Sequence, residues 1–129
     1  MKNTMKIVWK IVRFLFAAFM IFAGVQHFIN PAFYIPFVPS FLPFTTAIIY
    51  LSGLAEVLLG LMLFIPRYMR LGAGGILLLM ILFLPIHVWD VFSSHPAIGS
   101  HDAALIRLPI QFIFIFIAWK LWKLGRLQA

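Results

Sequence analysis

Four apolar stretches, separated by short breaks that contain proline, serine or basic residues, limit most strongly what this chain can fold into. They cover approximately residues 7–28, 47–65, 71–89 and 103–122. Each is close to the length of about 17–25 residues that a helix needs to cross the hydrocarbon core of a bilayer. None alternates apolar and polar residues with a period of two, which argues against a membrane barrel. We therefore expect an all-α fold, an integral membrane four-helix bundle formed by a single domain over residues 1–129.

Composition supports a lipid environment. The chain is 64% apolar and 10% charged, whereas soluble domains contain about 25% charged residues. A globule of this size keeps much of its surface in contact with solvent and cannot hide such an excess. The absence of cysteine excludes disulfides, thiolate metal sites and thiol catalysis within this chain.

Basic residues predict how the spans are oriented. Only Arg107 lies toward one end of a four-span bundle, and the other basic residues lie at the opposite end: Lys2, Lys6, Lys10, Arg13, Arg67, Arg70, Lys120, Lys123 and Arg126. The positive-inside rule then places both termini in the cytoplasm. Because these charges flank the spans, the net charge of +7 does not indicate a nucleic-acid partner. We expect the first stretch to be a retained span, since Ile21 is too bulky for the small-residue position of a signal-peptide cleavage site after Ala23.

The segment Phe33–Phe44 between the first two spans is uncharged and rich in phenylalanine. Pro36, Pro39 and Pro43 prevent a regular helix there, because proline lacks the backbone N–H that a helix uses. We expect an irregular, aromatic and proline-rich hairpin that packs on the outer end of the bundle. It could act as a cover for the helix ends or as one wall of an apolar ligand site.

Ionisable and amide side chains inside the spans are the candidate site residues, because such groups are costly in lipid. Glu56 lies near the middle of the second span, with Gly53 and Gly60 on its helical face, so we expect it to point into the bundle. Arg107 and Gln111 share one face of the fourth span. We expect these two residues and Glu56 to form a polar network in the outer half.

Further candidates lie at the outer ends of the spans. They are His27, Gln26 and Asn30 at the end of the first span, and, as secondary candidates, His87 and Asp90, which are spaced to touch on the third. No metal site is expected, since the spacing of Asp90, His95, His101 and Asp102 matches no compact ligand motif. A haem held by His27 and His87 is disfavoured, because both lie near the membrane surface among phenylalanines. The Glu56–Arg107 pair could also serve only to fix the packing of the helices.

Three stretches of the sequence resemble the DoxX family of small four-span bacterial membrane proteins: Gly24–Pro43, Ser52–Ala73 and Ile106–Trp122. They contain, in order, H-F-x-N-P, an intramembrane G-x-x-E and R-L-P-x-Q. The resemblance implies a four-helix bundle in a bacterial inner membrane, with characteristic polar positions at His27, Asn30, Pro31, Gly53, Glu56, Arg107 and Gln111. It also implies an association with quinone-linked redox enzymes, which makes a quinone the candidate cofactor.

Our leading functional hypothesis is a non-catalytic component of a membrane redox system, with a small apolar, quinone-like pocket in the outer half. One alternative is an assembly factor or scaffold whose polar network is purely structural. Another is a small-solute or proton carrier that uses Glu56 and works as an oligomer. Catalysis by this chain alone is not expected, because it has neither cysteine nor a flavin-binding motif. The expected partners are the lipid bilayer and a membrane or redox protein.

Overall fold

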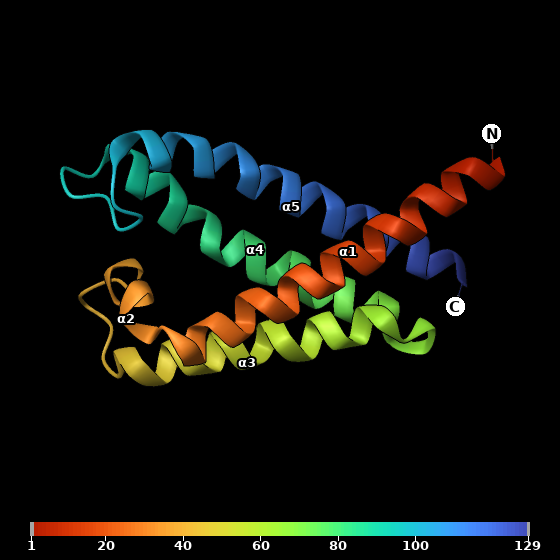
Figure 1. Ribbon diagram of the computed structural model, residues 1–129, viewed down its shortest axis with the longest axis horizontal. Helices are drawn as coiled ribbons and strands as arrows, with labels where there is room; N and C mark the ends of the chain where they lie inside the picture. The colour runs from red at the N-terminus through yellow and green to blue at the C-terminus, as the bar shows by residue number, and fades with distance from the viewer. Residues whose placement is uncertain (1, 129) are drawn as a thin grey trace.

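The computed structural model describes residues 2–128, which form helices and turns and no strand (Figure 1). Four long helices dominate: α1 (Lys2–Ile29), α3 (Thr45–Phe64), α4 (Met69–Phe92) and α5 (His101–Gln128). Short helical turns lie between them: α2 (Pro31–Tyr34), the 3-10 turn η1 (Ile35–Phe37) and the 3-10 turn η2 (Pro66–Tyr68). The predicted all-α four-helix bundle is confirmed.

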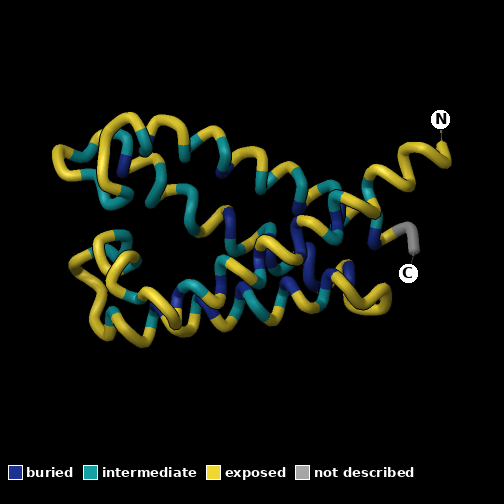
Figure 2. The backbone as a smooth tube through the Cα atoms, in the orientation of Figure 1, coloured by how far each residue is buried: buried dark blue, intermediate teal, exposed yellow. Residues whose placement is uncertain are grey.

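Exposed residues lie along all four long helices (Figure 2). Many of them are large and apolar. Each of these helices is long and apolar enough to cross a membrane, over Lys2–Ile29, Thr45–Phe64, Pro66–Phe92 and His101–Arg126. Large side chains such as Leu15, Leu71 and Ile106 are mostly exposed. Such a surface is stable against lipid tails and not against water. The chain is therefore a multi-pass membrane protein.

The long helices pack as two pairs, α1 with α3 and α4 with α5, and the two pairs meet mainly where α3 lies against α4 (Figure 1). Glycines bring α1 and α3 close together. A Cβ atom at Gly24 would lie 2.5 Å from the carbonyl oxygen of Gly53, and one at Gly53 would lie 2.5 Å from the Cβ of His27. Small residues at such crossings let helix backbones approach closely in membranes.

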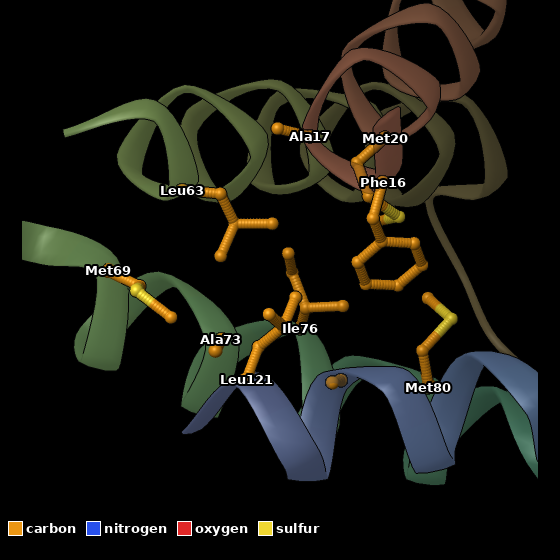
Figure 3. Close-up of a cluster of buried hydrophobic side chains, with 10 residues drawn as sticks. Phe16, Ala17, Met20, Leu63, Met69, Ala73, Ile76, Met80 and Leu121 are labelled. Atoms are coloured by element: carbon orange, nitrogen blue, oxygen red, sulfur yellow. The ribbon is translucent and has the colours of Figure 1, made fainter. Parts of the chain in front are cut away.

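The buried apolar core lies in the half of the bundle that carries both termini and η2, which we call the inner half (Figure 3). Its members come from all four long helices: Phe16, Ala17, Met20, Leu63, Met69, Ala73, Ile76, Met80, Ala118 and Leu121. The outer half carries α2, η1 and the loop between α4 and α5 (Figure 1).

Prolines mark several helix boundaries, as expected, but two lie inside helices. Pro31 and Pro36 stand at the starts of α2 and η1, so the aromatic hairpin contains two short helical turns before it becomes irregular. Pro66 opens η2 directly after α3. Pro85 and Pro109 lie within α4 and α5 without ending them. Membrane helices tolerate proline because neighbouring groups satisfy the backbone that it frees.

Arg13 does not behave as a simple flanking charge. It is buried, and its Nε donates a hydrogen bond to the carbonyl oxygen of Leu63 at the end of α3. The last carbonyls of a helix lack partners within the helix. Arg13 therefore links α1 to the inner end of α3, in addition to its place among the basic residues of the inner half.

Candidate functional site

A cavity of about 800 Å³ lies in the outer half, between the two helix pairs. All four long helices and the aromatic hairpin contribute to its walls, and the mostly apolar lining includes the rings of Phe33, Phe37, Phe83 and Phe114. Met20 and Met80 line it as well and also belong to the buried core. The cavity therefore ends where the packed core of the inner half begins.

The cavity reaches the lipid-facing surface of the bundle. Leu82 of α4 and Phe19 of α1 both line it, and they are 61% and 44% exposed. Both residues lie well inside their helices and away from the helix ends. An apolar molecule dissolved in the membrane thus has a short lateral route to the cavity.

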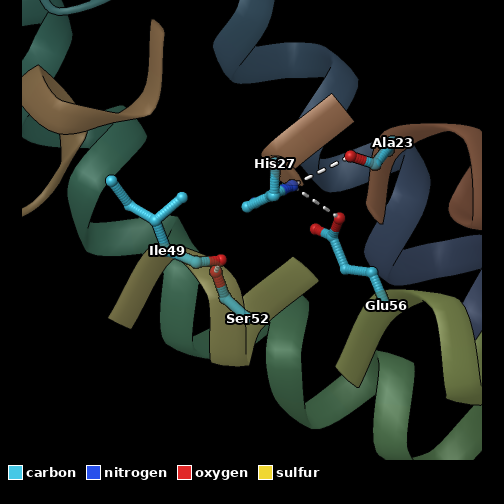
Figure 4. A network of polar contacts seen from close by, with 5 residues as sticks. All are labelled: Ala23, His27, Ile49, Ser52 and Glu56. Carbon is cyan, nitrogen blue, oxygen red and sulfur yellow. Dashed lines mark hydrogen bonds and ion pairs between the residues drawn. The ribbon is translucent and has the colours of Figure 1, made fainter. Parts of the chain in front are cut away.

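On the α1–α3 side, the cavity contains a buried His27–Glu56 pair (Figure 4). His27 Nδ1 lies 3.5 Å from Glu56 Oε2 and 2.9 Å from the carbonyl oxygen of Ala23. Because a carbonyl oxygen only accepts, Nδ1 carries the proton and donates to Ala23. Both side chains are nearly fully buried, and Glu56 is 6% exposed.

Gly53 explains why these two side chains meet. It lies three residues before Glu56, and the Cβ and ring of His27 occupy the space that a side chain at position 53 would take. The His27 ring also stacks on Tyr34 of α2, with ring centroids 3.9 Å apart and an angle of 16° between the planes. Burial, together with the negative charge of Glu56, raises the pKa of the Tyr34 phenol.

On the α4–α5 side, Arg107 and Gln111 form a second polar group. Arg107 Nη2 donates to Gln111 Oε1 at 2.8 Å, and Gln111 Nε2 donates to the carbonyl oxygen of Met80 at 2.7 Å. Gln111 is fully buried, whereas Arg107 lines the cavity, with its guanidinium 5.2 Å from the Phe114 ring centroid. The side-chain amide of Gln111, and not a second charged residue, therefore joins α5 to α4.

The structure brings Glu56, Arg107 and Gln111 to the outer half but does not join them into one network. Among the described side chains, Glu56 and Arg107 make neither a hydrogen bond nor an ion pair with each other. Instead, each keeps one buried atom without a hydrogen-bond partner, Oε2 of Glu56 and Nη1 of Arg107. One acceptor and one donor therefore lack a hydrogen bond, on residues from different helix pairs that line the same cavity.

The other expected site residues are more dispersed. His87 lines the cavity, but it forms no hydrogen bond or ion pair with Asp90 in the described structure, and Asp90 instead accepts the backbone N–H groups of Ala97 and Ile98 in the α4–α5 loop. Gln26 and Asn30 lie outside the cavity lining, and Asn30 is exposed. Within residues 2–128, no three His, Asp or Glu side chains group closely enough to hold a metal ion.

Two contacts of the site could not be read from the sequence. Tyr34 reaches His27 because the chain turns back at Asn30, so no helical spacing relates the two residues. Met80 contributes its backbone carbonyl, which carries no side-chain signal. Gln111, which donates to this carbonyl, did give an indication in the sequence, because a buried amide is expected to have a hydrogen-bond acceptor on the neighbouring helix.

Polar contacts follow the division into two helix pairs. In the described part of the chain, every side-chain hydrogen bond or ion pair between long helices stays within a pair: Arg13–Leu63 and His27–Glu56 in the first, Gln111–Met80 in the second. Across the pairs, the rings of Phe16 and Phe19 contact Phe114. The interface between the pairs is therefore largely apolar and aromatic.

Comparison with known proteins identifies a family without an assigned function. Residues 16–122 match the profile of a domain of unknown function, DUF8561, and the chain belongs to that family. The family scan gave no DoxX match. Searches of curated proteins and of solved structures found no match to this chain.

Proposed function

We propose that this DUF8561 membrane protein binds a small lipid-like molecule of the quinone class in its outer-half cavity, as a non-catalytic component of a membrane redox system. The observation that carries this proposal is a largely apolar cavity lined by two residues that each keep a buried polar atom without a hydrogen-bond partner, Glu56 Oε2 and Arg107 Nη1. Buried polar groups without partners cost about 1–3 kcal/mol each. A ligand that pairs with both of them recovers that cost.

The chemistry of a quinone head fits this cavity. Ligand sites typically measure about 300–1,000 Å³ and combine apolar walls with a few polar groups, and this cavity is about 800 Å³. A quinone carbonyl would accept from Arg107 Nη1, and a hydroxyl of the reduced form would donate to Glu56 Oε2. The rings of Phe33, Phe37 and Phe83 would pack against a planar head.

The route of entry supports a membrane-soluble ligand over a water-soluble one. The cavity wall at Leu82 and Phe19 is also part of the lipid-facing surface. An isoprenoid or acyl tail could remain in the bilayer while the head occupies the cavity. The redox context, by contrast, rests on the resemblance to the DoxX family alone.

Ligand binding can be tested on protein purified from native membranes in mild detergent, with mass spectrometry of the extracted lipids. We expect a quinone-class molecule with the wild-type protein and its loss from Glu56→Leu and Arg107→Leu. Gln26→Leu is the matched control, since it removes a polar side chain of α1 that lies outside the cavity lining. Retention of the ligand by both cavity variants, with folding verified by circular dichroism, would refute the proposal.

The conservative variant Glu56→Gln separates ligand binding from the two alternatives. If Glu56 accepts a hydrogen bond from the ligand, the amide oxygen preserves much of the binding. A proton carrier would lose activity as completely with Gln as with Leu, because an amide does not exchange a proton. A scaffold would contain no ligand and would instead co-purify with a membrane protein in fixed stoichiometry.

We also propose that the protein lies in a bacterial inner membrane with both termini in the cytoplasm. The concentration of basic residues at the inner end supports this orientation. A reporter fused after Leu127 and one inserted at Gly99 should show opposite sidedness. A periplasmic signal from the reporter after Leu127 would contradict the proposed orientation of the four helices.

A further inference from the structure

A second hollow, of about 330 Å³, lies at the inner end of α5 and is lined by Lys120, Lys123, Leu124 and Arg126. The three basic residues follow one another at intervals of three along the helix. A helix rises about 1.5 Å per residue, so the Cα atoms of successive basic residues are separated by about 4.5 Å along its axis. We call these four residues the basic hollow. It lies at the opposite end of the bundle from the cavity and shares no residue with it.

The charge of the basic hollow is not compensated within the described part of the protein. The sequence has three acidic residues, and Glu56, Asp90 and Asp102 lie in the middle or at the outer ends of their helices. None of the described basic side chains of the inner half forms an ion pair with a carboxylate. Like charges that line one hollow repel one another, and a bound anion would reduce the repulsion.

Tryptophan rings hold the three cations in place. Lys120 Nζ lies 5.9 Å from the ring of Trp9, Lys123 Nζ lies 4.7 Å from that of Trp119, and Arg126 Cζ lies 5.3 Å from that of Trp122. Tryptophan is enriched at the depth of the lipid headgroups. The rings engage one side of each cation, so its remaining N–H groups are available to a phosphate at that depth.

From this arrangement we propose that the basic hollow binds the headgroup phosphate of an anionic phospholipid. Three positive groups would surround the phosphate oxygens, while Leu124 would contact the apolar part of the lipid next to the headgroup. Basic pockets at this level of a membrane protein suit anionic headgroups in charge and in size. This site is independent of the ligand proposed for the outer-half cavity.

The test compares lipid retention in nanodiscs made of phosphatidylcholine with a minor fraction of phosphatidylglycerol, read by native mass spectrometry. The variant Lys120→Gln/Lys123→Gln/Arg126→Gln removes the three cations. Each basic residue near an anionic lipid contributes about fivefold in affinity, so we expect a loss of roughly 100-fold in phosphatidylglycerol retention. The control Lys2→Gln/Lys6→Gln/Arg67→Gln removes the same charge from the same half of the bundle and should retain the lipid.

Equal retention by the two triple variants would overturn the proposal, because general surface charge would then explain it. The single variant Lys123→Gln, at an exposed position, should still lose about fivefold, which keeps the test valid if the triple variant folds poorly. Stabilisation by inorganic phosphate in pure phosphatidylcholine discs, without any response to phosphatidylglycerol, would also overturn it and assign a soluble anion.

Discussion

The inner and outer halves of the bundle are built from the same four helices but differ in how they are filled. In the inner half, Ala17, Ala73 and Ala118 are fully buried in one apolar cluster with Leu63 and Ile76. Because alanine is small, the helices pack closely there. In the outer half, aromatic side chains and a proline within each of α4 and α5 accompany a cavity of about 800 Å³. The comparison shows that the inner half is packed across all four long helices, whereas close packing in the outer half joins α1 to α3 and leaves a cavity between the helix pairs.

The largest expected effect compares the same substitution in the two halves. Leu63→Ala truncates a fully buried core side chain and should lower the free energy of unfolding by about 2–5 kcal/mol, because the dense inner half cannot collapse onto the gap. Leu42→Ala, at the edge of the cavity, should change it by only about 0.5 kcal/mol. Thermal unfolding in detergent measures both, and equal losses would contradict the division into two halves.

The second prediction tests the part of the outer half that is tightly packed. Gly53→Ala places a methyl group where the His27 side chain lies, so we expect a loss of about 1–3 kcal/mol from overpacking. The same variant should separate His27 from Glu56 and weaken ligand binding. Leu54→Ala, the next position and exposed to lipid, is the control. A Gly53→Ala protein with wild-type stability would show that α1 and α3 are less closely packed than described.

A smaller effect is expected from the second polar group. Gln111→Leu removes the hydrogen bonds to Met80 and Arg107, and we expect a loss of about 1–2 kcal/mol in unfolding free energy. Gln26→Leu is the matched control, because Gln26 lies outside the cavity. If both variants lose the same stability, the buried amide does not join α4 to α5 as described.

The smallest effect concerns the titration of Tyr34, at the outer edge of the cavity. Burial and the charge of Glu56 raise the pKa of this phenol above its ordinary value of 10.0. The folded state is therefore favoured below that value, and this contribution is lost as the pH rises through the raised pKa. Difference spectra of tyrosinate between wild-type and Tyr34→Phe proteins should show the late transition, and Glu56→Gln should move it to lower pH.

The sequence allowed the fold to be predicted more fully than the site. Lipid physics and the four apolar stretches were sufficient for the bundle, and the glycines near Glu56 indicated which face of α3 is buried. The partner of Glu56 was not predictable, because His27 and Arg107 both line the cavity and the contact with His27 depends on the close approach of α1 to α3. The contact from Tyr34 depends on the turn at Asn30, whose geometry has no periodic signature.

The confinement of polar contacts to each helix pair bears on how the protein is made. Each pair consists of consecutive long helices, and the short turn η2 connects the two pairs. During synthesis, α1 and α3 can enter the membrane as one hairpin and complete their own hydrogen bonds before α4 and α5 emerge from the ribosome. The second hairpin can do the same, after which the two associate through apolar and aromatic surfaces. Two co-expressed fragments divided at η2 should therefore each insert and then reassemble into the complete bundle.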